Sequence, residues 1–139
     1  MPTVERIVRA GCPVPEIWVR LCDYEAAPRW DPRLETVERI QGEGDLGTVY
    51  RTRSSLAGVT TDGVLRVTGY RRHELLQLRG AHAKLRATET LKVLRGRHGA
   101  FVHWTSELEA PPDVADVSEH ELERVGDALV EGLAAFLRE

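Results

Sequence analysis

The segment KLRATETLKVL, residues 84–94, places a carboxylate among apolar side chains. Alternate residues of a strand share a face, so Glu89 shares its face with Leu85, Ala87, Leu91 and Val93. If that face is internal, desolvation raises the pKa of Glu89 and suits it to general acid–base chemistry. The alternatives are that Arg86, Thr88 and Thr90 face inward, or that Glu89 lies near the sheet end in water.

A second alternating segment, GTVYRTRSS, offers a phenol or a guanidinium to a cavity. Tyr50 shares one face with Thr52 and Ser54, and the other face carries Val49, Arg51 and Arg53. An inward Tyr50 could donate its phenol to a ligand carbonyl, whereas an inward Arg51 could hold an anionic group. We favour Tyr50 inside, because a buried unpaired arginine is costly. Glu89 and Tyr50 are therefore the candidate catalytic residues.

Other catalytic and metal-binding patterns are missing from the sequence. The histidines are scattered, with His73, His82 and His98 in expected turns, His103 on an outward strand face and His120 in a first helical turn. There is no HExxH, no Gly-x-Ser-x-Gly elbow and no Gly-x-Gly-x-x-Gly after a strand. Cys12 and Cys22 lack zinc spacing, and we interpret them as buried small hydrophobes. We expect neither a metal nor a cofactor.

Length and charge favour one globular domain, 1–139, without nucleic acid as a partner. The chain has 139 residues, 42% hydrophobic and 29% charged, with a net charge of −3. The basic runs YRRHE and RGRHG are typical of solvated hairpin tips. No segment has the apolar length of a signal peptide or a membrane span. We therefore expect a cytoplasmic protein that does not insert into membranes.

The order of expected elements is strand, short helices, strands, helix. TVERIVRA predicts a first strand, and PVPEIWVRLCD a short helix with Pro15 in its first turn. Asp23–Pro32 indicates a broken helical turn and a loop. Six strand-like segments follow, separated by GEGDLG, SLAG, YRRHE, GAHA and RGRHG. With no helix between them, an antiparallel meander is favoured.

The last strand and a C-terminal helix supply the two apolar faces of the expected core. AFVHWTSELEA alternates cleanly, with Ala100, Val102, Trp104, Ser106 and Leu108 on one face. In VTTDGVLRVTG we expect Leu65 and Val67 to face inward and Asp62 outward. Ser118 stands three residues before Glu121 as a capping box, opening an amphipathic helix of about twenty residues. Gly126 and Gly132 inside it permit close approach to a strand, leave room beside a ligand, or are merely tolerated.

This order of elements resembles the helix-grip fold of the SRPBCC superfamily, which includes START domains and polyketide cyclase/dehydrase-type proteins. VRAGCPVPEIWVRLCDYEAAPRWDPRLETVERI is similar to the family's opening, GEGDLGTVYRTR to its glycine-rich turn and third strand, and HGAFVHWTSELEA to its last strand. The resemblance implies an α+β fold. In it, a curved antiparallel sheet of about seven strands surrounds the C-terminal helix, two short helices follow the first strand, and a cavity lies between sheet and helix.

The resemblance further implies that this cavity binds a small hydrophobic molecule, lipid-, aromatic- or polyketide-like. It places Trp30 at the cavity mouth, either as a plug or as a ligand contact. The expected lining is Trp30, Tyr50, Leu65, Val67, Leu85, Ala87, Val102, Trp104, Ser106, Leu122, Val125, Leu129 and Leu133. One alternative is a polyketide cyclase or dehydratase using Glu89 or Tyr50 as acid/base. Another is a protein-interaction or quinone-chaperone-like role. The sequence also leaves open a homodimer through an exposed strand edge.

Overall fold

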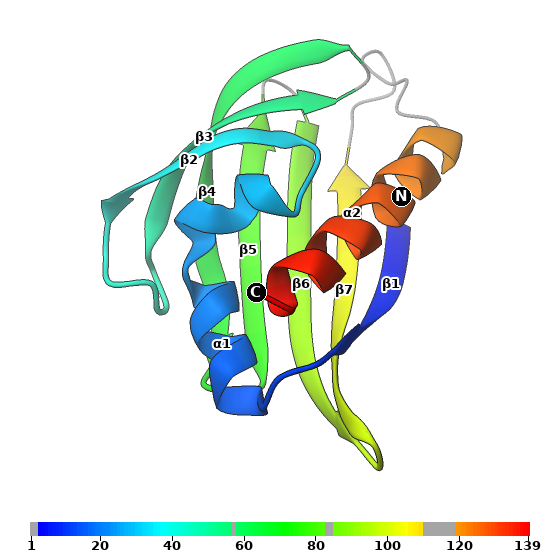
Figure 1. The fold of residues 1–139 in the computed structure, drawn as a ribbon. Coiled ribbons are helices and arrows are strands. Elements are labelled where there is room, and N and C mark those ends of the chain that lie inside the picture. The colour runs from blue at the N-terminus through cyan, green and yellow to red at the C-terminus, as the bar shows by residue number, and fades with distance from the viewer. Residues whose placement is uncertain (1–2, 57, 83–84, 110–118) are drawn as a thin grey trace.

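The computed structural model describes residues 3–56, 58–82, 85–109 and 119–139. In chain order the elements are β1 (Thr3–Ala10), α1 (Val14–Cys22), the 3₁₀ helix η1 (Tyr24–Arg29), β2 (Leu34–Gln41), β3 (Val49–Leu56), β4 (Val59–Arg71), β5 (Leu75–His82), β6 (Leu85–Gly96), β7 (Gly99–Glu109) and α2 (Glu119–Leu137). Figure 1 shows a curved sheet with α2 lying across its concave side and with α1 near one end.

The sheet is a single antiparallel layer with the strand order β1-β7-β6-β5-β4-β3-β2. Strands β2 to β7 form a meander, and β1 joins its end by pairing with β7, for example Val8 with Val102. Short turns between consecutive strands make this arrangement local along most of the chain. The α+β helix-grip architecture with seven strands, expected from the sequence, is therefore confirmed.

The inward faces of the strands follow the alternation in the sequence. On β6 the face carrying Ala87 and Glu89 is buried, and on β3 Tyr50 is buried while Arg51 is exposed. Leu65 and Val67 of β4 face inward, and so do Val102, Trp104 and Ser106 of β7. Leu85, at the start of β6, is only partly buried. Tyr50 thus faces inward as the sequence favoured, and the question that the sequence left open for Glu89 is decided by its burial.

The corner made by α1 and η1 closes one end of the sheet. Pro13 caps α1 and Pro15 lies in its first turn, where a missing N–H costs no helical hydrogen bond. Ile17, Trp18 and Leu21 of α1 are buried. The expected broken turn is the 3₁₀ helix η1, which contains Pro28. This corner leads the chain directly into residues 30–34, a mostly buried stretch that ends at the first residue of β2.

Helix α2 packs its apolar stripe on the sheet and on the η1 corner. Leu122, Leu129 and Leu133 are at most 2% exposed, whereas Val125 is half-buried. A Cβ on Gly132 would come within 2.7 Å of the carbonyl oxygen of Trp30, and one on Gly126 within 3.0 Å of Val4. The two glycines therefore serve close packing. The predicted Ser118 capping box lies outside the described residues.

Some local expectations were wrong. Strand β5 continues through the first three residues of GAHA, so His82 ends a strand and does not lie in a turn. Cys12 and Cys22 are free and only half-buried, and burial raises the pKa of the Cys22 thiol to about 11. The described histidine, cysteine, aspartate and glutamate side chains form no cluster of three suited to a metal ion.

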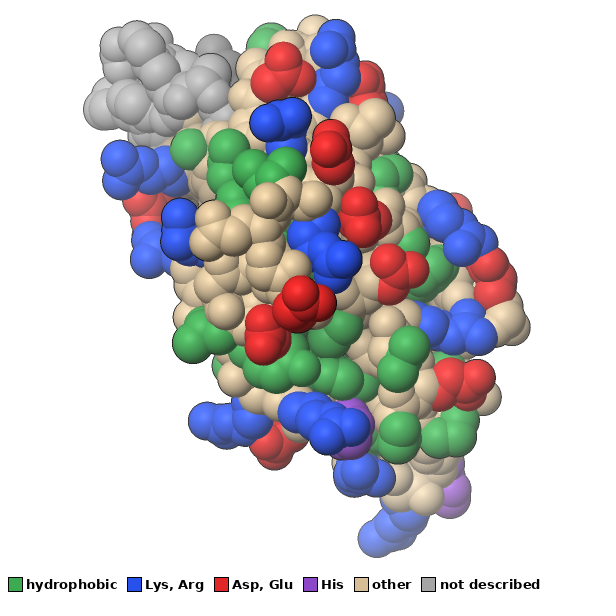
Figure 2. Space-filling model, turned by 90° about the vertical axis from the view of Figure 1, so that its left-hand side faces the viewer, with side chains coloured by type: hydrophobic (Ala, Val, Ile, Leu, Met, Phe, Trp, Pro, Cys, Tyr) green, Lys and Arg blue, Asp and Glu red, His purple; other side chains and the backbone are tan. Residues whose placement is uncertain are grey.

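Surface hydrophobic side chains are dispersed on the face that carries α1 and β2. Val19 is 70% exposed and Leu46 is 65% exposed. Figure 2 shows that hydrophobic side chains on this face form small groups separated by arginine, lysine, aspartate and glutamate. Within the described residues, neither α1 nor α2 combines the length and apolar character needed to cross a membrane.

Candidate functional site

Three charged side chains are buried together at the inner face of the sheet. Asp31 and Arg33 lie where the chain passes from η1 into β2, and Glu89 lies on β6. Their exposed fractions are 1%, 8% and 5%. Residues of these types are almost never so buried unless they are paired, so this buried cluster is the first place to look for function.

The turn of residues 31–33 holds the side chains of Asp31 and Arg33 together. The Asp31 carboxylate accepts hydrogen bonds from Arg33 Nε at 3.1 Å and from Nη2 at 2.9 Å. Its Oδ1 also accepts from the Arg33 backbone N–H at 3.0 Å, an i to i+2 turn of the kind that aspartate favours. Pro32 between them restricts the backbone. The guanidinium is therefore oriented by its own loop before it meets the sheet.

Glu89 joins the cluster from the sheet. Its Oε1 lies 2.5 Å from Arg33 Nη2 and accepts a 3.0 Å hydrogen bond from Ser106 Oγ. Its Oε2 accepts from Trp104 Nε1 at 3.1 Å. Ser106 is the cross-strand partner of Glu89, which explains the contact. Arg33 Nη1 donates to Ser106 Oγ at 3.2 Å, and the guanidinium stands 5.7 Å from the Trp104 ring centroid.

Burial and charge act in opposite directions within this cluster. Desolvation, assisted by the charge of Asp31, raises the pKa of Glu89 to about 7, against the opposing effects of Arg33 and the Ser106 hydrogen bond. Desolvation also disfavours the charge on Arg33, but Asp31 and Glu89 outweigh it and raise the guanidinium pKa. Arg33 therefore stays cationic while Glu89 exchanges a proton near neutral pH.

A hollow of about 380 Å³ opens beside Arg33. We call it the grip mouth. It lies between the β3–β4 hairpin and the first half of α2, and its lining is Pro32, Arg33, Ser55, Leu56, Gly58, Glu121, Arg124, Val125 and Ala128. Its volume falls at the lower end of the range for small-molecule sites. The mouth thus gives an outside molecule a route to one side of the buried cluster.

Most of the predicted lining residues pack against one another. The following are 8% exposed or less: Trp30, Tyr50, Leu65, Val67, Ala87, Val102, Trp104, Ser106, Leu122, Leu129 and Leu133. Val125 lines the grip mouth. Tyr50 lines a different hollow, beside α1 and η1. Strands β4 and β5 separate Tyr50 on β3 from Glu89 on β6, so the two candidate acid–base residues do not form a pair.

Trp30 is buried beneath the η1 corner. It is 3% exposed, its ring meets Tyr24 edge-to-face with centroids 5.9 Å apart, and its backbone lies against Gly132. This packing is that of a plug. Its indole Nε1 and the hydroxyl of Thr52 are nevertheless buried without a hydrogen-bond partner among the described residues. Such groups carry a desolvation cost of about 1–3 kcal/mol each.

Sequence reasoning missed Asp31 and Arg33. They belong to the segment WDPRL, in which a charged pair is enclosed by Trp30 and Leu34. Apolar residues on both sides of Asp-Pro-Arg were the available signal, because they draw the charged pair into the core. The partner of that pair, Glu89, was found by strand parity.

Comparison with known proteins supports the same fold. Residues 1–138 match the family model described as polyketide cyclase / dehydrase and lipid transport, and the chain belongs to that family. The aromatase/cyclase Zhui from a Streptomyces species is 16% identical with a TM-score of 0.72, covering 98% of this chain and 93% of that one. Ara h 8.0201 is 12% identical with a TM-score of 0.69, covering 98% and 97%.

A further similar structure is a Deinococcus radiodurans protein that is 15% identical with a TM-score of 0.75, covering 100% of this chain and 96% of that one. At such identities the likeness shows the helix-grip fold alone. No curated protein matches the sequence. The family and the fold do not name a ligand, which must be argued from the site.

Proposed function

We propose that the protein binds a small, mainly apolar molecule between the sheet and α2, with a polar end directed at Arg33 through the grip mouth. The observation that carries this proposal is a permanently charged, almost fully buried arginine at the base of a hollow. Of the five N–H groups of a guanidinium, the described contacts engage four, with Asp31, Glu89 and Ser106. One Nη1 donor is left for a ligand oxygen.

Two further buried groups support an apolar ligand with oxygen or nitrogen atoms. Trp30 offers an indole N–H and Thr52 a hydroxyl, neither of which has a partner among the described residues. The surrounding positions are apolar, with Leu65 at 3% and Val67 at 1% exposure. A few polar groups in an apolar lining is the usual composition of a small-molecule site. Because these lining side chains are packed, a molecule can bind between the sheet and α2 only if α2 or the β3–β4 hairpin moves outward.

The experiment is native mass spectrometry of the protein isolated from its own cells, with a variant that fills the grip mouth. Ala128 is exposed on α2 and lines the mouth, so Ala128→Trp blocks it without entering the core. Ala135→Trp, an exposed position further along the same helix, is the matched control. We expect a bound small molecule in the wild type and in Ala135→Trp, and its loss in Ala128→Trp. Equal retention in both variants would contradict a route through the mouth.

Acid–base catalysis on a carbonyl substrate is a second candidate function, favoured by the Glu89 pKa of about 7. In this scheme the remaining Arg33 donor polarises the carbonyl, and Glu89 removes or returns a proton at the adjacent carbon. Tyr50 does not serve this role, because burial raises its pKa to about 12 and it lies on another hollow. The test is deuterium incorporation into 2-tetralone in D₂O, which Glu89→Gln should abolish. Equal incorporation by Glu89→Gln would exclude this function.

A further inference from the structure

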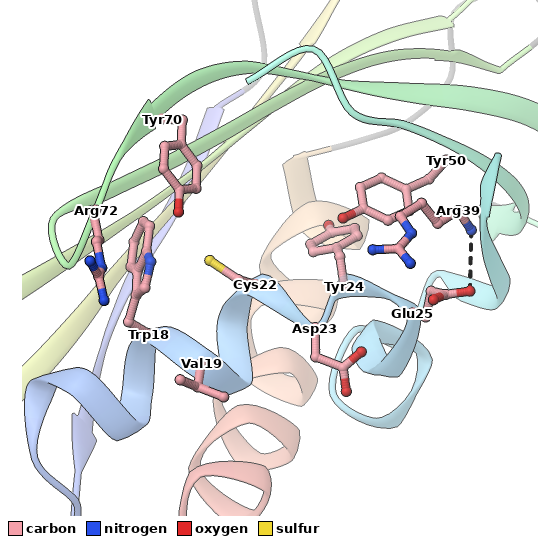
Figure 3. A pocket seen from close by; sticks show the side chains of 10 residues that line it. All are labelled: Trp18, Val19, Cys22, Asp23, Tyr24, Glu25, Arg39, Tyr50, Tyr70 and Arg72. Carbon is pink, nitrogen blue, oxygen red and sulfur yellow. Dashed lines mark hydrogen bonds between the residues drawn. The ribbon is translucent and has the colours of Figure 1, made fainter. Parts of the chain in front are cut away.

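A second hollow, distinct from the grip mouth, lies between α1, η1 and the strands β2 to β4. Its volume is about 360 Å³, and none of the residues that line it also lines the grip mouth. Figure 3 shows its walls, which come from α1 and η1 on one side and from the sheet on the other. We call it the aromatic hollow.

Four aromatic rings form two pairs along this hollow. Trp18 and Tyr70 meet edge-to-face with centroids 5.5 Å apart, and Tyr24 and Tyr50 are tilted with centroids 5.6 Å apart. Trp18, Tyr24 and Tyr50 are buried to within 4% exposure, so their positions are fixed by packing. The half-buried Cys22 lies between the two pairs (Figure 3). Rigid aromatic walls of this kind favour a flat ring that can stack or insert edge-on.

Two guanidinium groups stand at the edges of the aromatic hollow. Figure 3 shows Arg39 directed toward the rings of Tyr24 and Tyr50, and Arg72 beside Trp18. Among the described residues, neither has a carboxylate within salt-bridge distance. Glu25 instead accepts a hydrogen bond from the Arg39 backbone N–H at 3.2 Å. Glu25 and Asp23 also line the hollow, and their charges act on Tyr50 beside that of Arg39. An arginine without an ion pair beside aromatic rings is nevertheless suited to a carboxylate, which it binds with two parallel hydrogen bonds.

We propose that the aromatic hollow is a second binding site, for a planar aromatic carboxylate whose ring lies between the Trp18–Tyr70 and Tyr24–Tyr50 pairs and whose carboxylate pairs with Arg39. The Tyr50 phenol, which stays protonated at neutral pH, adds a neutral donor at the same end. Asp23 also lines the hollow, but its carboxylate points away from the rings (Figure 3). This second site does not require that a ligand also binds between the sheet and α2.

The test is a titration with 2-naphthoate followed by ¹⁵N–¹H NMR, with 2-naphthol as the uncharged comparison. We expect saturable shifts at the Trp18 indole N–H and at the backbone amides of Val19 and Cys22. Binding of 2-naphthol should be weaker. Shifts confined to Arg33, Val125 and Ala128 would place the probe in the grip mouth and overturn the proposal, as would the absence of saturable shifts.

Substitution of Arg39 tests the charged contact. Arg39 is exposed on β2, so Arg39→Gln leaves the core intact. A charge-assisted contact is worth enough to predict at least about tenfold weaker 2-naphthoate binding in this variant. Arg51→Gln, an exposed outward position on β3 beside Tyr50, is the control and should bind within about twofold of the wild type. Equal binding by Arg39→Gln and Arg51→Gln would overturn the carboxylate assignment.

Discussion

The grip mouth and the aromatic hollow each present an arginine, and the two arginines differ in how their charge is balanced. Arg33 is 8% exposed and is held by Asp31, Glu89 and Ser106. Arg39 is exposed and has no ion-pair partner among the described residues. Tyr24 stands between the two regions, since it lines the aromatic hollow and its pKa is raised by burial and by the charges of Asp31 and Glu89.

This difference separates a charge that the fold depends on from a charge that the fold does not need. A buried ion pair adds little stability compared with an apolar replacement of the same shape. Removal of one partner, however, leaves the other charge buried and unpaired, which is strongly destabilising. An exposed arginine contributes little to stability, whether or not it has an ion-pair partner. The stability of variants therefore distinguishes the two regions independently of any ligand.

The largest expected effect is on the stability of Arg33→Met. This change leaves Asp31 and Glu89 buried without their cation, and we expect a loss of about 3–5 kcal/mol in the free energy of unfolding. Urea denaturation measures it, with Arg51→Met as the exposed control. A loss below about 1 kcal/mol would show that the cluster is hydrated or rearranges, and would remove the contrast between the two arginines.

The pH dependence of stability is the next largest effect. The folded-state pKa of Glu89, about 7, lies above its ordinary value of 4.5, so the folded protein holds the extra proton between these two pH values. Glu89 therefore stabilises the fold fully below pH 4.5, and that contribution is lost as pH rises to 7, by roughly 3 kcal/mol.

The measurement is the unfolding free energy of the wild type relative to Glu89→Gln between pH 4.5 and 8. The difference should fall as pH rises through this window. A difference that is flat, or that rises with pH, would mean that Arg33 and the two hydrogen-bond donors keep Glu89 ionised.

Substitution of the two packed glycines of α2 is expected to have a smaller effect on stability. Gly132→Ala places a Cβ against the Trp30 backbone, which precedes Asp31, and we expect a net loss of about 1–2 kcal/mol despite better helix propensity. Gly126→Ala meets the side chains of Val4 and Arg6, which can adjust, and should be nearer neutral. Thermal unfolding of both variants compares the two losses of stability. If Gly126→Ala were the more damaging, the corner at Trp30 would not be the tighter contact.

The smallest expected effect is on the stability of Arg39→Gln. Because the Arg39 side chain is exposed and unpaired among the described residues, the variant should unfold within about 0.5 kcal/mol of the wild type. Chemical denaturation measured beside Arg51→Gln tests this. A loss comparable to that of Arg33→Met would mean that Arg39 is part of the fold and that the two regions do not differ as described.

The fold was predictable because its signals are local. Alternation in AFVHWTSELEA predicted its inward face, alternation in KLRATETLKVL grouped Glu89 with apolar residues, and the three-to-four spacing from Leu122 onward predicted the helix stripe. Strand parity therefore found Glu89 and Ser106 without knowledge of their contacts.

The candidate site was only partly predictable because it is built from contacts between distant segments. Arg33 meets Ser106 across 73 residues of sequence, and only the folded corner brings them together. Tyr50 faced inward as predicted, but parity could not say that its side chain would lie beside α1 and η1 rather than beside Glu89. Side-chain parity gives the face of a sheet, and the curvature of the sheet decides which hollow that face lines.

The most direct test of the central claim is the side-chain ¹⁵N–¹H resonance of Arg33, measured before and after bound small molecules are extracted from protein isolated from its own cells. If a ligand binds at Arg33 between the sheet and α2, the Nε–H signal of Arg33 shifts on extraction while that of Arg39 stays in place. An Arg33 signal that does not move when the bound mass is lost would contradict the claim.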